Sequence, residues 1–440
     1  MFPDDLLDLI RDATNDALPA NTPTFDNREI VQCFGLLHGI TLRPTGNIMD
    51  NWKKDSAGFY PAPDFGTRHG VPRDRFDLWK RHLCFTRAPA TPAERNDPWH
   101  DVRQLLKTFN DHMAAVFGPS WKVCGDESMI AWKGKGAGDP RETRGMPHVQ
   151  KIKRKPRGVG VELKDIACAY TRILFRVEIQ ESAEAMKGKK WNDKWQKTTA
   201  TTMRLAEGLF GSGRVLCCDS WFGSVETACA LLSKGVYFSG IVKGAVRRYP
   251  IKYLKGFGWP GEEYQRSVTM ELETDVQVTD KDNIRAEPKT KKLFAHVWRE
   301  PGKRVGKPEM RKYLITTWGH TATAAKVPDC RKKRIRVNDD GMIEDWVLLV
   351  PWTAPFEEAF EGLCAIDVHN HLRQHGFGLE DAWASKKWQN RVLAGMLGIM
   401  EVNAYLAYVH FTKHQIPHSR FTENLALKMV NNPLGIGGSG

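Results

Sequence analysis

Paired metal-binding cysteines are absent from this sequence of 440 residues. Its nine cysteines form no C-x-x-C pair, and their number is odd, so neither a zinc ribbon nor a disulfide framework is indicated. A reducing compartment fits this cysteine usage best. A basic leader is absent as well, because residues 1–20 carry five aspartates, the reverse of a signal or transit peptide.

Long hydrophobic runs without polar residues are also missing. The most apolar late stretch, residues 392–409, contains Glu401 and Asn403, which a bilayer would penalise. We therefore expect a buried amphipathic helix there, and an intracellular soluble protein with no membrane partner. Hydrophobic residues make up 41% of the chain and charged residues 27%, which excludes a wholly disordered chain.

Positive charge is in surplus. The 65 lysines and arginines exceed the 52 aspartates and glutamates by 13. Such a surplus favours a polyanionic partner, either nucleic acid or an anionic membrane surface, and does not choose between them. The length predicts two to three domains with enough material for a real core.

The periodicity changes along the chain. Residues 27–120 show mainly helical spacing of apolar residues. Residues 121–132 and 166–179 are typical of strands that pair across a long basic connection. Residues 244–345 are charged and rich in short strand patterns, and residues 355–413 return to helix.

A strand–helix–strand unit is predicted over residues 214–242. The buried-strand pattern V-L-C-C ends at Asp219, and Ser224 is a candidate N-cap of the helix that follows. Gly235 can end that helix, and residues 236–242 read as the next strand. The sequence therefore predicts an α/β sheet.

Three aspartates stand out as candidates for chemistry. Asp126 lies inside an apolar strand pattern, Asp219 at the end of a strand, and Asp367 in a helical segment. Carboxylates that meet at a sheet edge would suit Mg²⁺, and two such ions can promote phosphodiester chemistry. Each has an ordinary alternative, since an aspartate at a strand end is commonly a turn or cap residue and one on a helix a surface charge.

Three blocks around these aspartates resemble those of piggyBac-type transposases. They are D-E-S-M-I-A-W-K-G-K at 126–135, V-L-C-C-D-S-W-F-G-S and the residues after it at 215–240, and A-I-D-V-H-N at 365–370. Lys155-Pro156, K-K-W at 386–388 and N-A-Y at 403–405 also match the family's pattern, as do positions of its N-terminal helical domain. The resemblance covers residues 27–413.

The resemblance implies an α/β, RNase H-like (DDE/D transposase) catalytic core with a β-rich insertion and an N-terminal helical domain. The implied division is an N-terminal tail (1–26), a helical dimerisation and DNA-binding domain (27–120), the first part of the core (121–243), the insertion (244–345), the helical second part of the core (346–415) and a tail (416–440).

The resemblance also implies a site and an activity. Asp126, Asp219 and Asp367 would be the catalytic, metal-binding carboxylates for Mg²⁺ or Mn²⁺. Asn370 stands where the family has a second acidic residue in the third block, and it can offer the metal a carbonyl oxygen but no charge. The implied enzyme cleaves and transfers DNA strands at transposon ends, as a nuclear homodimer that binds double-stranded transposon ends and target. No cysteine follows Cys364, so no zinc domain is apparent.

Basic residues are the candidate contacts to DNA phosphates. They are Lys151, Lys153, Arg154, Lys155, Arg157, Lys190, Arg331, Lys332, Lys333 and Arg334. The run at 331–334 could also be a nuclear import signal, and any of these runs could be a solvated charged face. Trp191 and Trp195, which lie among lysines, are read as core residues rather than as DNA-stacking ones.

Two other functions stay open at this point. A domesticated, transposase-derived DNA-binding protein would keep the fold without the chemistry. An unrelated RNase H-like nuclease would explain the carboxylates but not the helical matches on both sides of them.

Overall fold

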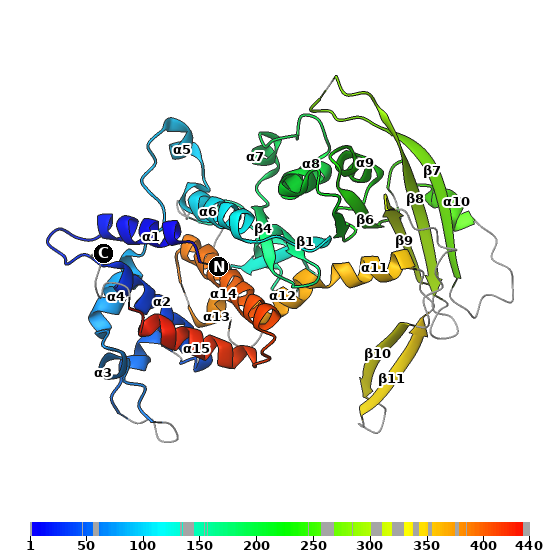
Figure 1. Cartoon of the computed structure of the whole chain (residues 1–440). Helices are drawn as coiled ribbons and strands as arrows, with labels where there is room; N and C mark the ends of the chain where they lie inside the picture. Colours follow the sequence, from blue (N-terminus) through cyan, green and yellow to red (C-terminus); the bar gives the residue numbers. More distant parts are fainter. Residues whose placement is uncertain are drawn as a thin grey trace.

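The computed structural model describes residues 2–45, 47–55, 61–132, 134, 145–153, 155, 157–244, 246–256, 268–283, 285–300, 310–318, 330–337, 343–350, 354–374, 378–383 and 385–433. One large sheet runs through the molecule and includes its long strands (Figure 1). Helices from both ends of the chain gather on one side of the molecule, and long strands extend on the other.

The elements follow one another in this order. The helices are α1 (Asp4–Asp16), α2 (Asn27–Leu42), η1 (Ile48–Trp52), α3 (Phe65–His69), α4 (Arg73–His82), α5 (Pro92–Asn96), α6 (His100–Val116), α7 (Ala183–Lys187), α8 (Lys197–Ala206), η2 (Glu207–Leu209), α9 (Val225–Ser233), α10 (Ile251–Gly256), α11 (Ala354–Leu363), α12 (Ala365–Gln374), α13 (Leu379–Ala382), α14 (Trp388–Thr412) and α15 (His418–Val430). The strands are β1 (Lys122–Ala131), β2 (Gln150–Lys151), β3 (Val159–Cys168), β4 (Leu174–Ile179), β5 (Val215–Cys218), β6 (Tyr237–Val242), β7 (Val268–Val278), β8 (Lys289–Glu300), β9 (Met310–Thr316), β10 (Cys330–Val337) and β11 (Ile343–Val350). The predicted α/β class is confirmed.

The central sheet is mixed. Its strands run in the order β2-β3-β1-β5-β6-β9-β8-β7, and β4 pairs with β3. β3 is antiparallel to β1, whereas β5 is parallel to β1 and β6 is parallel to β5. Strands β7, β8 and β9 of the predicted strand-rich segment 244–345 continue this sheet, because β9 pairs with β6 and with β8, and β8 pairs with β7. β10 and β11 form a separate two-stranded sheet.

The strand–helix–strand prediction over 214–242 is confirmed by β5, α9 and β6. The Ser224 hydroxyl accepts a hydrogen bond from the backbone N–H of Thr227 at 3.0 Å and so caps α9. Gly235 follows the helix with φ +69°, a left-handed conformation that glycine adopts without strain.

The strand predicted at 166–179 is instead a pair of strands, β3 and β4. The chain turns between them, where the N–H of Arg172 donates to the carbonyl of Cys168 at 2.8 Å and Arg172 has φ +63°. Tyr170 and Thr171 have high strand propensity, yet they lie in this turn and Tyr170 is 71% exposed. The predicted pairing of 121–132 with 166–179 therefore holds only for residues 166–168, which belong to β3, because residues 174–179 form β4 and pair with β3 instead.

Both predicted tails contain packed helices, so the tail interpretation of 1–26 and 416–440 is wrong for these parts. In α1, Leu6 and Ile10 are fully buried on one helix face while the aspartates lie outside. α15 packs on α2 so closely that a Cβ atom added at Gly35 would lie 2.8 Å from the Cβ of Met429. Residues 435–440, also expected as a tail, lie outside the described part.

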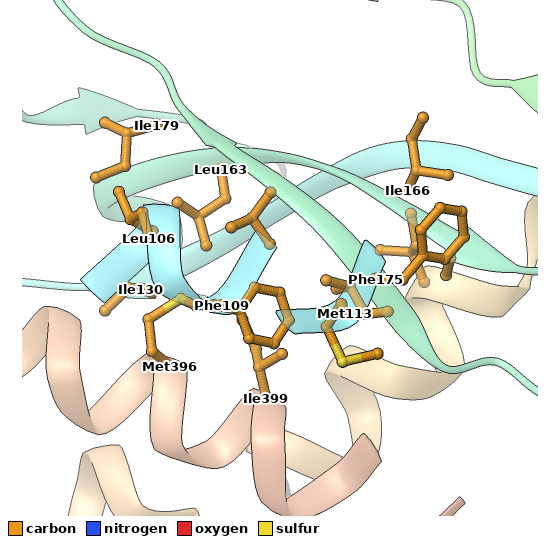
Figure 2. Close-up of a cluster of buried hydrophobic side chains, with 14 of the residues drawn as sticks. Leu106, Phe109, Met113, Ile130, Leu163, Ile166, Phe175, Ile179, Met396 and Ile399 are labelled. Carbon is orange, nitrogen blue, oxygen red and sulfur yellow. The ribbon is translucent and has the colours of Figure 1, made fainter. Parts of the chain in front are cut away.

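The core lies between the sheet and helices α6 and α14 (Figure 2). Phe109 of α6 and Met396 and Ile399 of α14 approach Ile130 and Leu163 of the sheet, and all five are buried. Within the described residues, α14 is long and apolar enough to cross a membrane, and 72% of its most apolar window is buried inside the fold. The prediction of a buried helix over 392–409 is confirmed.

Candidate metal centre

The parallel pairing of β1 with β5 brings the first two predicted aspartates together. The last residue pair in register is Gly125 with Cys218, so Asp126, in the middle of β1, and Asp219, directly after β5, both come next after this pair. A Cβ atom at position 125 would lie 2.7 Å from the Cys218 Sγ atom, so the close approach of the strands requires the glycine. Asp126, Glu127 and Asp219 each offer a carboxylate oxygen within 4.8 Å of the others. We call these three residues the acidic cluster.

Backbone N–H groups orient the aspartates. Asp219 Oδ1 accepts a hydrogen bond from the N–H of Trp221 at 2.8 Å, and the carbonyl of Asp219 accepts one from Phe222 at 3.2 Å. Asp126 Oδ1 accepts a hydrogen bond from the N–H of Glu127 at 2.8 Å. Both carboxylates are therefore held in place by the local turn and strand.

The cluster concentrates negative charge in a buried place. Asp126 is 8% exposed. Burial, and then the charges of Glu127 and Asp219, raise the pKa of the Asp126 carboxyl to about 8. A divalent cation would relieve both effects. Oxygen ligands without cysteine or histidine suit hard ions such as Mg²⁺ and Mn²⁺, so this donor set fits the predicted cation.

Glu127 was not among the predicted site residues. It follows Asp126 in a strand, and strand alternation normally sends neighbouring side chains to opposite faces. Two lysines hold its buried carboxylate: Lys155 Nζ lies 3.6 Å from Oε1, and Lys164 Nζ lies 3.4 Å from Oε2. Lys155 also donates to the carbonyl of Glu127 at 3.1 Å.

Asp367 and Asn370 are not members of the acidic cluster. Both are on α12 and line a pocket of about 180 Å³. Its other lining residues are Met129, Lys155, Arg157, His371 and Gln374. Asp367 is exposed, and Asn370 Oδ1 is 3.4 Å from a guanidinium nitrogen of Arg373. The structure thus brings two of the three predicted aspartates together and leaves the third on the neighbouring helix.

α12 is fastened to β1 at this pocket. Arg373 Nη2 and Gln374 Nε2 both donate to the carbonyl of Met129, at 2.8 and 2.9 Å. Arg373 also pairs with the buried carboxylate of Glu380. The helix that carries Asp367 is therefore anchored next to the strand that carries Asp126.

The predicted DNA contacts have different surroundings. Lys155 and Arg157 line the same pocket as Asp367, and Arg157 also pairs with Asp381 at 2.5 Å. Lys151 and Lys153, which precede Lys155 in the sequence, are exposed. Lys190 is paired with Glu207. Arg154 lies outside the described residues, as do the side chains of Arg331, Lys332, Lys333 and Arg334, whose backbone forms part of β10.

The tryptophans among the lysines are structural. Trp191 is 5% exposed, and its indole N–H donates to the carboxylate of Asp282 at 2.9 Å. Trp195 is partly buried against the core. Neither residue is in a helix, because α7 ends at Lys187 and α8 begins at Lys197, but the prediction of core packing is confirmed.

Comparisons with known proteins agree with this architecture. A family model described as Transposase IS4 matches residues 1–313, and the chain belongs to this family of transposases. A solved structure of a piggyBac transposase synaptic complex with hairpin DNA is similar in fold, with a TM-score of 0.69 and 17% sequence identity. The similarity covers 100% of this chain and 81% of that one. Among curated proteins, none matches the sequence. The predicted resemblance to piggyBac-type transposases is confirmed in fold, and the family model confirms that the chain is a member of a transposase family.

Proposed function

We propose that this chain is a DNA transposase that cleaves and transfers DNA strands with Mg²⁺ or Mn²⁺ held at the acidic cluster. The convergence of Asp126, Glu127 and Asp219 at one sheet edge carries the proposal. The strand order β4-β3-β1-β5-β6, with β5 and β6 parallel to β1, supports an RNase H-like core. Ligand sites of α/β sheets gather at such strand ends.

The residues of the site divide the work. Asp126 and Asp219, fixed by backbone N–H groups, would be the cation ligands. Bound divalent ions would activate the attacking oxygen and stabilise the leaving oxygen of the phosphodiester. Asp367 would add a third carboxylate from α12 by reorienting its exposed side chain, and Asn370 would add a neutral oxygen. Lys155, beside Glu127, places positive charge where a substrate phosphate would lie.

Double-stranded DNA is the proposed partner. The net charge of +13, the pocket residues Lys155 and Arg157, and the exposed Lys151 and Lys153 support it. The similar piggyBac structure is itself a complex with DNA, and we extend that partner to this chain. A homodimer and a nuclear location complete the proposal. We extend both to this chain from its resemblance to piggyBac-type transposases.

Strand cleavage tests this function. Duplex DNA carrying the genomic flanks of the gene would be incubated with the protein and Mg²⁺ or Mn²⁺, and nicks would be mapped on sequencing gels. We expect cleavage by the native protein and none by Asp219→Asn. A matched control, Asp74→Asn on the exposed face of α4, should cleave normally. Cleavage by Asp219→Asn at the native rate would contradict the assignment.

A second function is favoured by one observation. Asp367 is exposed and outside the acidic cluster, and Asn370 brings no charge to compensate. A transposase-derived DNA-binding protein without catalysis fits this arrangement. It predicts salt-dependent binding of the same duplex with no strand cleavage in either metal. Restoring the acidic residue with Asn370→Asp should then not create cleavage.

A further inference from the structure

A completely buried lysine lies behind the acidic cluster. Lys164 is in the middle of β3 and has 0% exposure. Lysine is seldom buried unless its charge is paired. Its Nζ atom lies 2.8 Å from Glu162, 3.4 Å from Glu127 and 3.8 Å from the centre of the Trp221 ring. The ammonium group of Lys164 thus contacts two carboxylates and the face of an aromatic ring.

These contacts reach both segments that carry the predicted metal ligands. Glu127 adjoins Asp126 in β1, and it is also the residue directly opposite Lys164 in the β1–β3 register. Trp221 belongs to the turn after β5, and its backbone N–H donates to Asp219. Lys164 is therefore a bridge between the strand of one aspartate and the turn of the other.

We propose that Lys164 is a positioning residue that holds Glu127 and the Asp219 turn in the geometry that binds a divalent cation. The inference rests on the proposed metal-dependent function. Three carboxylates close together repel one another, and a fixed cation on the far side of Glu127 offsets this repulsion. The contact of the Lys164 ammonium with the Trp221 ring also fixes the position of Trp221, whose backbone N–H holds the Asp219 carboxylate.

The direction in which cation affinity changes when Lys164 is replaced distinguishes a positioning role from a purely electrostatic one. Removing a positive charge near a cation site would by itself strengthen cation binding, because a repulsion disappears. Removing a residue that positions the ligands weakens binding instead. Loss of groups that orient metal ligands typically lowers affinity by about 10- to 100-fold. We expect Lys164→Met to weaken Mn²⁺ binding in this range.

The experiment measures Mn²⁺ affinity by electron paramagnetic resonance on the full chain, treated with EDTA and free of DNA. Lys234→Met is the matched control, because Lys234 is also a largely buried lysine that pairs with two carboxylates, Asp280 and Asp282. It should leave the Mn²⁺ affinity unchanged. Trp221→Leu should weaken binding, and Trp221→Phe, which keeps an aromatic ring, should retain most of it.

The outcomes are distinct. If the native protein binds Mn²⁺ and both Lys164→Met and Trp221→Leu bind it equally well or more tightly, the positioning role of Lys164 is overturned while the proposed function stands. If the native protein binds no Mn²⁺, the proposed function fails and the inference falls with it. If circular dichroism shows that Lys164→Met does not fold, the two Trp221 variants decide, because they leave the buried charges paired.

Discussion

Asp126→Asn should remove a pH-dependent loss of unfolding free energy from the metal-free protein. The Asp126 carboxyl has its pKa raised from 3.8 to about 8 by burial and by the neighbouring carboxylates. A group whose pKa is higher in the folded state gives its full stability below pH 4, and this stability is lost as the pH rises towards 8. The size of the rise corresponds to about 6 kcal/mol of lost unfolding free energy between these limits.

Urea denaturation in EDTA at pH 5, 6, 7 and 8 measures this cost. The native protein should become progressively less stable than Asp126→Asn as the pH rises, because the asparagine does not ionise. The exposed control Asp74→Asn should follow the native curve. Mn²⁺ at 100 times its dissociation constant adds about 2.7 kcal/mol to the protein that binds it, so it should reverse the order at pH 5 and narrow the difference at pH 7 and 8. Parallel pH curves for the native protein and Asp126→Asn in EDTA would refute the reasoning.

Two further predictions concern packing. Gly35→Ala should destabilise the protein by about 1–3 kcal/mol in urea denaturation, because the new methyl group would lie 2.8 Å from Met429 of α15. Gly39→Ala, in the same helix but with nothing within 4 Å, should stabilise it by about 1 kcal/mol. Equal effects of the two substitutions would contradict the contact. Ion pairs with Lys194 and Lys234 lower the pKa of Asp282 to about 2 and connect the segment between β7 and β8 to the rest of the fold. Asp282→Asn should therefore speed proteolysis between β7 and β8. Cleavage at the native rate would contradict this stabilising role of the ion pairs.

The two central aspartates could be predicted because their signal is local. An apolar strand that ends in aspartate, followed by a capped helix, places Asp219 at a strand end whatever the rest of the chain does. Asp126 follows from the same logic once β1 and β5 are parallel neighbours. Asp367 has no such constraint, because its position depends on how α12 docks, through Arg373 and Gln374, on the carbonyl of Met129.

Glu127 and Lys164 could not be predicted in the same way. Their contact depends on the register between β1 and β3, which places the two residues directly opposite each other. Two strands separated by a long connection can pair in several registers, and a shift by one residue exchanges the faces of all side chains. The sequence alone contains no turn that fixes this register.

Tertiary packing also decided the elements that were assigned wrongly. Tyr170 and Thr171 have the composition of a strand, but the hydrogen bond from Arg172 to Cys168 makes them a turn. α1 lies in the segment 1–26 that the family resemblance assigned to a tail, and its buried face becomes evident only because Leu6 and Ile10 pack in the hydrophobic core. Likewise, β9 joins β6 across more than seventy residues, a distance over which local patterns carry no pairing information.

Anomalous diffraction from crystals grown with Mn²⁺ tests the central claim most directly. The account predicts a manganese peak bridged by carboxylate oxygens of Asp126 and Asp219, at roughly the 2.0–2.2 Å expected for a small divalent ion with oxygen ligands. The same map would show whether Asp367 moves in to join them. A map with no manganese at these two aspartates, or with manganese only elsewhere on the chain, would contradict the account.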